Sequence, residues 1–250
     1  MTGQEAIAYI HAQHWQQRSL GLGRMRRLLR LLGNPQDKLR FVHVAGTNGK
    51  GSTCAMIAAI LGAAGYRVGL NTSPYLITFH ERIRVDGRMI PDEDLGRLTA
   101  QVRPAAESMD ERPTEFELIT AIALLYFVQC SCDIVVLEVG LGGALDASNV
   151  IPPPEAAVIT AMGMDHAAVL GATQAEIARA KAGIIKPGSP TVSFGGCPEA
   201  DAVIRRTCHE QGSPLKEADF SRAKVCSMSL EGTVLDCAPY GRLTLPLTGA

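Results

Sequence analysis

The chain of 250 residues lacks the features that mark several large classes of protein. Its longest apolar runs are interrupted or too short to cross a bilayer. Its start, MTGQEAIAYIHAQHW, has neither the basic beginning nor the apolar centre of a secretory signal. The formal net charge is −1 with no dominant basic block, which argues against nucleic acid or an anionic membrane as the main partner. We therefore expect a cytoplasmic monomer that binds neither nucleic acid nor membrane.

The cysteines carry no metal-site pattern. There are seven, they are scattered, and none forms a CxxC pair, so a zinc site is not indicated. Free buried thiols in a cytoplasmic protein are the plain interpretation. With 46% hydrophobic and 20% charged residues, the chain can bury a core and is long enough for one large or two small domains.

The most informative segment that is present is GTNGKGST, residues 46–53. The apolar run 41–45 precedes it, and an alanine-rich stretch of helical periodicity, 54–65, follows. A strand, a glycine turn and a helix in this order build a phosphate cradle, because glycines admit an anion close to the backbone and the new helix contributes its positive end. Lys50 supplies a mobile charge for a β- or γ-phosphate, and the hydroxyls of Ser52 and Thr53 are within reach of a magnesium ion.

The match to the common P-loop pattern is imperfect. That pattern places glycine where this chain has Val44, and it places serine or threonine directly after the lysine, where Gly51 intervenes. A glycine-rich surface turn is the alternative interpretation. The flanking strand and helix favour a nucleoside triphosphate site.

Strand and helix patterns alternate along most of the chain. We predict helices over residues 2–17, 25–32, 92–109, 114–130 and 173–182, and strands over 41–45, 67–70, 81–87, 133–139, 156–160 and 191–194. The apolar run 133–139 is typical of a strand buried on both faces. These patterns predict an α/β fold with an open, mostly parallel sheet covered by helices on both faces. Short alternating segments at 224–228, 233–237 and 242–247 predict a small antiparallel β extension.

Polar residues follow several of the predicted strands, where ligands sit in open α/β sheets. Ser73, Glu138 and the pair Asp165-His166 are candidates for a divalent ion shared with phosphates, although magnesium more often takes oxygen ligands alone. Each has a structural alternative. Glu138 would pair with an arginine, Ser73 would form a Ser-Pro turn, and His166 would be a solvated loop residue.

Lys181 is a candidate of another kind. It falls at the end of a predicted helix, and by itself it reads as a lysine that the helix dipole favours there.

Six segments together resemble one family. They are GNPQ…FVHVAGTNGKGST, GYRVGLNTSPYL, ERIRVDG, PTEFELITAIA, DIVVLEVGLGGALDASN and MDHAAVLGATQAEIARAKAGIIKPG. Their order is that of folylpolyglutamate synthase/dihydrofolate synthase, a relative of the Mur peptidoglycan ligases. The resemblance spans residues 20–188 and extends weakly to LTLPLTGA at the end, which resembles the family's junction between two domains.

The resemblance implies a reaction. The family transfers the γ-phosphoryl group of ATP to a carboxylate of dihydropteroate or of a folate, and the amino group of L-glutamate then attacks the acyl phosphate. An amide forms, and ADP and phosphate leave. The implied partners are ATP, L-glutamate and dihydropteroate or a reduced folate, with Mg²⁺ as cofactor. In such a reaction the protein chiefly positions the reactants and neutralises charge.

The resemblance also implies roles for particular residues. The ATP phosphates would be held by Thr47, Asn48, Gly49, Lys50, Gly51, Ser52 and Thr53. Magnesium would be placed by Ser73, Glu138 and His166, with His166 and Lys50 also counted as catalytic. Lys181 matches a lysine that is carbamylated in the family, forming an N6-carboxylysine. This role would replace the interpretation of Lys181 as a helix-end lysine favoured by the dipole. The folate pocket would be lined by Thr114, Glu115, Phe116, Glu117 and Leu145, and less securely by the neighbourhood of residues 17–20.

Three positions depart from the family pattern. The family has histidine where this chain has Tyr75, arginine where it has Ala144, and glutamate where it has Ala180. Loss of the arginine removes a charge partner for phosphate or substrate, and loss of the glutamate removes a negative neighbour of Lys181. Either change would alter substrate choice or weaken catalysis.

The family continues into a second domain that these residues do not include. We therefore interpret residues 1–250 as an ATP-binding domain with a helical segment at 1–40 and a β extension at 213–250, and with the C-terminal glutamate-ligase domain absent. On this interpretation the chain by itself would bind nucleotide weakly and ligate little. Three alternatives remain: a Mur-type ligase of UDP-linked peptides, a nucleotide-binding remnant without ligase activity, and a P-loop NTPase of another class. The N-terminal helices and GNPQ favour the folate branch over the first, and LEVGLGG with MDH disfavours the last.

Overall fold

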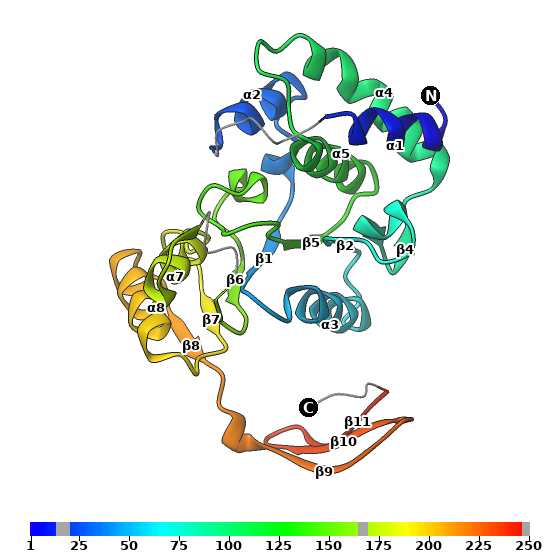
Figure 1. Ribbon diagram of the computed structural model, residues 1–250. Helices are drawn as coiled ribbons and strands as arrows, with labels where there is room; N and C mark the ends of the chain where they lie inside the picture. Colours follow the sequence, from blue (N-terminus) through cyan, green and yellow to red (C-terminus); the bar gives the residue numbers. More distant parts are fainter. Residues whose placement is uncertain (14–20, 165–169, 247–250) are drawn as a thin grey trace. The chain divides into compact units, whose positions relative to one another are not determined.

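The computed structural model describes residues 1–13, 21–164 and 170–246 (Figure 1). The chain divides into two compact units, Met1–Lys216 and Glu217–Ala250. None of the helices in the described ranges combines the length and the apolar character needed to span a bilayer.

The first unit is built on an eight-stranded sheet of order β4-β3-β2-β5-β1-β6-β7-β8. Strands β2, β5, β1, β6 and β7 run parallel, and β3 and β4 continue the sheet antiparallel at one edge. The strands are β1 (Phe41–Ala45), β2 (Val68–Asn71), β3 (Ile83–Val85), β4 (Arg88–Met89), β5 (Ile134–Glu138), β6 (Ala156–Ile159), β7 (Thr191–Ser193) and β8 (Leu215–Glu217). The predicted open, mostly parallel sheet is confirmed.

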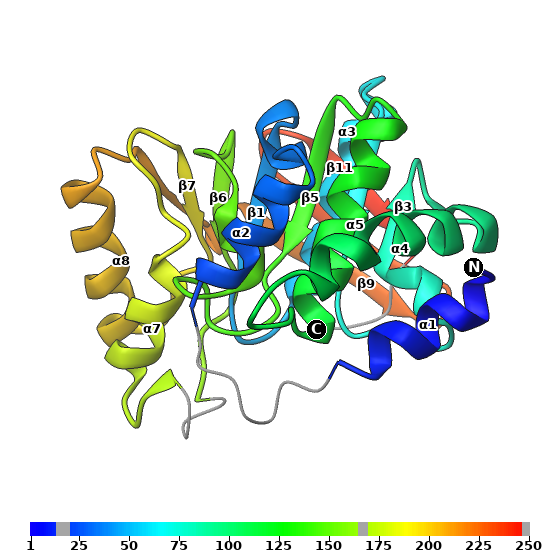
Figure 2. The same cartoon turned by 90° about the horizontal axis from the view of Figure 1, so that it is seen from above.

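Helices cover both faces of this sheet, as Figures 1 and 2 show. Alternation along β1 decides which helix lies where. Val42 and Val44 point to the face covered by α3 (Lys50–Ala63). Phe41 points to the opposite face, where the core includes residues of four helices: α1 (Gly3–His11), α2 (Gly23–Leu31), α4 (Asp92–Glu107) and α5 (Glu115–Gln129). Ala45 points to that same face, where α7 (Gln174–Ala182) and α8 (Pro198–Glu210) cover β6.

Helix α5 is the central element of the larger core. It is apolar around most of its circumference, because ten of its residues are buried. Its start is fixed by the predicted capping box. The Thr114 hydroxyl accepts from the Glu117 N–H at 3.3 Å, and the Glu117 carboxylate accepts from the Thr114 N–H at 2.7 Å. A cap of this kind stabilises a helix by about 1 kcal/mol.

Two parts of the first unit differ from the sequence prediction. The first two residues of the predicted strand 81–87 belong to a short 3-10 helix, η2 (Phe79–Arg82), and only Ile83–Val85 of it is strand. The reason is the Glu81 carboxylate, which accepts hydrogen bonds from the backbone N–H groups of Leu76, Ile77 and Thr78 in the preceding loop and closes a turn. Helix α8 and strand β8 were not predicted. Two further short helices among the described residues of this unit are η1 (Pro35–Lys38) and η3 (Ala147–Val150).

The second unit contains an antiparallel sheet of order β11-β10-β9. A short helix, η4 (Phe220–Arg222), precedes the strands β9 (Ala223–Ser229), β10 (Gly232–Cys237) and β11 (Gly241–Leu245). Leu235 lies opposite both Val225 and Leu243, so the apolar side chains gather on one face. The predicted small antiparallel sheet is confirmed.

Candidate functional site

The glycine loop lies between the carboxyl end of β1 and the start of α3. Gly46 has φ of 152°, and a Cβ there would lie 1.8 Å from the Thr160 hydroxyl oxygen, so no larger residue fits without movement. Gly49 has φ of 78° and immediately precedes α3. The N–H groups of the first helical turn at Gly51 and Ser52 have no intrahelical acceptor. The loop therefore offers backbone donors and the positive end of a 14-residue helix to an anion.

The first half of the loop is tied to the segment after β6. The N–H groups of Thr47 and Asn48 donate to the Ala161 carbonyl at 2.9 and 3.3 Å, and the Thr160 hydroxyl donates to the Asn48 carbonyl at 2.7 Å. The Thr47 hydroxyl exchanges hydrogen bonds with the backbone of Gly163. In this structure Thr47 and Asn48 thus use their backbone N–H groups to hold the loop in shape.

Two lysines meet at one carbonyl of the loop. Lys50 Nζ donates to the carbonyls of Gly46 at 3.2 Å and Thr47 at 3.1 Å. Lys181 Nζ donates to the same Gly46 carbonyl at 2.8 Å. Lys181 does lie in the last turn of α7, but it is 3% exposed and faces the glycine loop instead of solvent. Interaction with the helix dipole alone does not explain why the Lys181 side chain is buried.

Glu138 ends β5 beside the start of α3. It is 3% exposed, and its Oε2 accepts from the Ser73 backbone N–H at 2.8 Å. A Cβ on Gly51 would lie 3.7 and 3.8 Å from the two carboxylate oxygens, so the carboxylate faces the first turn of α3. Burial raises the pKa of Glu138, while the Ser73 N–H and the charges of Lys50 and Arg82 oppose that rise. Within the described ranges no arginine forms an ion pair with Glu138.

The structure therefore brings Ser73 and Glu138 to the glycine loop. His166, the third predicted metal ligand, lies outside the described residues, as does Asp165. The predicted neighbourhood 17–20 is outside them too.

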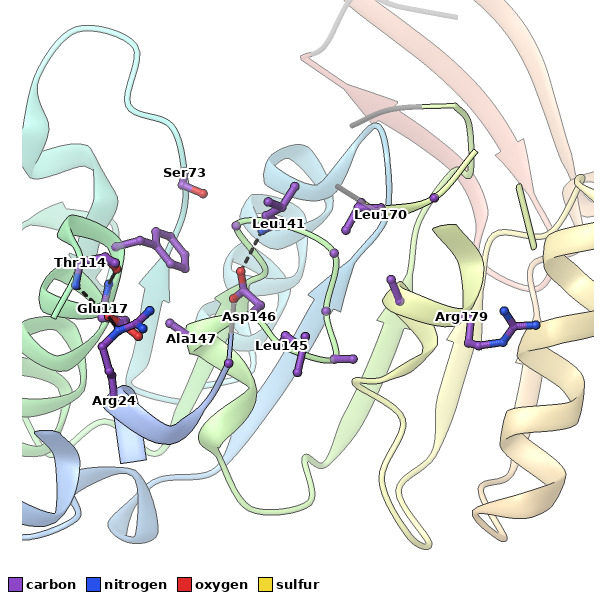
Figure 3. Close-up of a pocket in the computed structure, with 18 of the residues that line it drawn as sticks. Arg24, Ser73, Thr114, Glu117, Leu141, Leu145, Asp146, Ala147, Leu170 and Arg179 are labelled. Carbon is purple, nitrogen blue, oxygen red and sulfur yellow. Dashed lines mark hydrogen bonds and ion pairs between the residues drawn. The ribbon is translucent and has the colours of Figure 1, made fainter. Parts of the chain in front are cut away.

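A cavity of about 850 Å³ opens next to this corner (Figure 3). Its wall is formed by the loop after β2, the first turn of α5, the loop after β5, and one face of α7. Further lining residues come from α2 and η2. The lining includes Arg24, Ser73, Arg82, Thr114, Phe116, Glu117, Leu141, Leu145, Asp146 and Ala180. The lining surface is mostly apolar and includes several charged residues.

Four of the five predicted folate-binding residues line this cavity: Thr114, Phe116, Glu117 and Leu145. Glu115 does not. Its carboxylate lies 3.2 Å from His11 Nδ1 and 4.0 Å from Arg82, because it follows the helix-capping threonine and points to the side of α1. The Glu117 carboxylate is already engaged by Arg24 at 3.2 Å.

Arg82 is a site residue that the sequence did not single out. Its side chain is 12% exposed, and its Cζ lies 5.2 Å from the Tyr75 ring centroid and 5.7 Å from that of Phe79. Burial lowers its pKa, and its Nε has no hydrogen-bond partner among the described residues. The alternation of polar and apolar residues in ERIRVDG predicted a strand. It did not indicate that Arg82 would end η2 and line a cavity.

Two of the three departures from the family pattern are neighbours in space. The Ala144 N–H donates to the Ala180 carbonyl at 2.7 Å, and both residues line the cavity. A Cβ on Gly183 would lie 2.3 Å from the Ala144 Cβ, so the loop packs directly on the end of α7. The two alanines themselves contribute no charge to this wall of the cavity.

Comparison with known proteins places these features in a family. The model of the Mur ligase middle domain matches residues 44–194. The dihydrofolate synthase/folylpolyglutamate synthase of Bacillus subtilis is 48% identical over 218 residues, which cover 85% of this chain and 50% of that protein. The chain thus spans about half the length of the curated relatives it matches.

Solved structures agree with these matches. An FPGS–AMPPCP–folate complex has a TM-score of 0.91 at 41% identity and covers 100% of this chain and 63% of its own. Escherichia coli FolC in complex with DHPP and ADP has a TM-score of 0.83 at 34% identity, covering 99% of this chain and 58% of its own.

Proposed function

Because the chain belongs to the Mur ligase family, whose middle domain it contains, we propose that it forms the ATP and acid sites of a ligase that adds L-glutamate to dihydropteroate or a reduced folate. The observation that carries this proposal is the position of Ser73. Its N–H binds Glu138 beside the glycine loop, and the same residue lines the adjoining cavity. A phosphate site and an acid site that share one residue suit transfer of phosphate to a carboxylate. The relatives crystallised with AMPPCP and folate, and with DHPP and ADP, support the same pairing.

The glycine loop is the proposed site of the ATP phosphates. Its residues 47–53 surround the N-terminus of α3, and the ammonium of Lys50 already lies over the loop. On this proposal Thr47 and Asn48 keep the loop in shape. Residues 49–53 present backbone N–H donors to the phosphates, and Lys50 adds its side-chain ammonium.

A magnesium ion fits the chemistry of the corner between Glu138 and Ser73. A buried carboxylate without a cation is costly, and Glu138 has no arginine partner among the described residues. We propose that Glu138, Ser73 and His166 hold the ion, with phosphate oxygens and water completing its shell. No group of three or more His, Cys, Asp or Glu side chains in the described ranges forms a metal site without such additions. When bound, magnesium would neutralise charge on the phosphates.

We also propose that Lys181 is carbamylated. Its amine would add to carbon dioxide and lose a proton, which forms a carbamate. Two ammonium groups on the single Gly46 carbonyl disfavour each other, and the carbamate would replace one of them by an anion. The carbamate nitrogen keeps one hydrogen, so its bond to the Gly46 carbonyl is compatible with both forms.

The cavity is the proposed site of the acid. Phe116 and Leu145 offer apolar surface to a planar ring, and Arg82 offers a buried cation to a carboxylate. An oxygen of the acid would attack the γ-phosphorus, and the bond to the bridging oxygen would break to release ADP. The amine of glutamate would then attack the acyl carbon, lose a proton and expel phosphate. The chain's own groups orient the acid and offset the negative charge that accumulates.

Replacement of Lys50 tests the proposal. In the complete polypeptide, Lys50→Ala should abolish ATP-dependent attachment of glutamate to dihydropteroate or tetrahydrofolate, because the phosphates lose their mobile cation. Lys38→Ala, at an exposed lysine of η1, is the matched control and should ligate at the parent rate. Ligation by Lys50→Ala at the parent rate would show that the glycine loop is not the ATP site. Offering the two acids separately would decide which one is the substrate.

A further inference from the structure

A buried chain of hydrogen bonds runs from β1 to the loop that forms one wall of the cavity. His43 Nε2 lies 2.8 Å from the Ser148 hydroxyl oxygen, and that hydroxyl lies 2.5 Å from Asp146 Oδ1. His43 and Ser148 are fully buried, and Asp146 is nearly so. A hydroxyl has one hydrogen. If Ser148 donates it to the carboxylate, Ser148 must accept from His43, which then carries its proton on Nε2.

Asp146 is the point around which the loop is folded. Its Oδ2 accepts from the Leu141 N–H at 2.8 Å, a contact drawn in Figure 3, and its Oδ1 accepts from the Ser148 N–H at 2.9 Å. Leu141, Leu145, Asp146 and Ala147 all line the cavity. The wall therefore takes its shape from one carboxylate, and Ser148 connects that carboxylate to β1.

The far side of the same loop is held by Asn149. Its side-chain nitrogen donates to the Ala144 carbonyl at 3.2 Å and to the Gly183 carbonyl at 3.0 Å, which joins the loop to the end of α7. The loop is thus held at both ends by buried polar groups, and His43 is the only one of these groups that lies on the strand leading to the glycine loop.

A histidine at this place is not explained by packing alone. Among the described residues, the one hydrogen bond of its imidazole goes to Ser148, and its Nδ1 has no partner there. A buried nitrogen without a partner costs free energy that an apolar side chain of similar size would avoid. A satisfied core histidine would show both nitrogens bonded.

We propose that His43 is a positioning residue for the acid pocket: by donating to Ser148 it fixes the hydroxyl that anchors Asp146, and Asp146 fixes the wall from Leu141 to Ala147. His43 does not line the cavity, so it acts only through Ser148 and Asp146. The proposal rests on the proposed function in so far as the ligand of the pocket is a pterin acid. Its structural part, the order of the loop, does not depend on which ligand binds.

The test compares variants that differ in one donor. His43→Leu fills the space but cannot donate, Ser148→Ala removes the middle of the chain, and His43→Gln carries an amide that can donate to Ser148. Val136→Ala, in β5 on the opposite face of the sheet, is the control for a general loss of packing. Hydrogen exchange of the Leu141 amide is measured first, because that amide donates to Asp146.

We expect the Leu141 amide to exchange about tenfold faster in His43→Leu and Ser148→Ala than in Val136→Ala at matched stability. A tenfold change corresponds to about 1.4 kcal/mol, which is within the range expected for loss of a buried hydrogen bond. His43→Gln should restore most of the protection. Calorimetry measures the affinity for whichever acid the unaltered protein binds, dihydropteroate or tetrahydrofolate. That affinity should fall about five- to tenfold in the same two variants, with the affinity for AMPPCP unchanged.

The outcomes separate the two proposals. If the unaltered protein binds neither dihydropteroate nor tetrahydrofolate, the proposed function fails, and the exchange of Leu141 still decides the role of His43. If Leu141 exchanges at the same rate in His43→Leu and Val136→Ala, His43 does not position the loop. Faster exchange with unchanged affinity for the acid that the unaltered protein binds would also overturn the proposal, because the wall would then not shape the pocket.

Discussion

The buried His43 should make the protein sensitive to mild acid. Burial, with the nearby Lys186 charge as a second cause, lowers the pKa of His43 to about 3 from 6.5. The neutral imidazole is therefore the native form, while the unfolded chain takes up a proton below about pH 6.5. Since the unfolded state binds the extra proton, the contribution of His43 to stability is complete above that pH and is lost as the pH falls toward about 3.

The size of this effect follows from the shift. The whole displacement corresponds to about 5 kcal/mol, and about 2 kcal/mol of it is lost between about pH 7.5 and pH 5. A domain is stable by only about 5–15 kcal/mol, so a loss of this size is readily measured. Lys186 does not complicate this window, because burial lowers its pKa only to about 8.

Urea unfolding at the two pH values, for the parent protein and for His43→Gln, isolates the effect. Glutamine fills the site and does not titrate, and all other acids are shared by the two proteins. The free energy of unfolding of the parent should fall by about 2 kcal/mol more than that of the variant. Parallel losses in the two proteins would mean that His43 is not held neutral by burial, and the tautomer assigned above would lose its basis.

Two other replacements test the phosphate corner. Glu138→Gln keeps an acceptor for the Ser73 N–H and removes the charge, so the magnesium dependence of AMPPCP binding should weaken about tenfold; an unchanged magnesium titration would exclude Glu138 as a ligand. Because burial raises the pKa of Glu138, magnesium should bind better as the pH rises through that raised value. Gly46→Ala should cost about 3 kcal/mol of unfolding free energy and abolish AMPPCP binding, since a Cβ would overlap the Thr160 hydroxyl. Gly188→Ala is the control, because Gly188 has φ of 71° but a Cβ there would meet nothing within 4 Å. It should cost about 1 kcal/mol of unfolding free energy. Equal losses in Gly46→Ala and Gly188→Ala would contradict the steric argument.

The local features of the fold were predictable from the sequence. The boundaries of β1 and the capping boxes at Thr2, Thr114 and Thr173 were predicted correctly, because a strand before a glycine loop and a threonine–glutamate cap depend on a few adjacent residues. The first of these helices was predicted to extend to residue 17, but it ends at His11. Residues 14–17 of the predicted range lie outside the described residues.

Features that depend on distant contacts were not predictable in the same way. The strand begins at Ile83, two residues later than predicted, because the Glu81 carboxylate binds three backbone N–H groups of the preceding loop. Glu115 belongs to the right motif, but the direction of the helix turns it away from the cavity. His43 and Arg82 have no spacing pattern, since their neighbours Ser148 and Tyr75 are supplied by other parts of the fold.

The most direct test of the central claim follows an oxygen atom. Dihydropteroate or tetrahydrofolate labelled with ¹⁸O in its reacting carboxylate is incubated with the complete polypeptide, ATP, magnesium and L-glutamate, and the released phosphate is analysed by mass spectrometry. If the carboxylate is phosphorylated at the glycine loop, one ¹⁸O atom should appear in the phosphate for each amide formed, and Lys50→Ala should release none. Amide formation with unlabelled phosphate would contradict the acyl phosphate, and with it the assignment of the two adjoining sites.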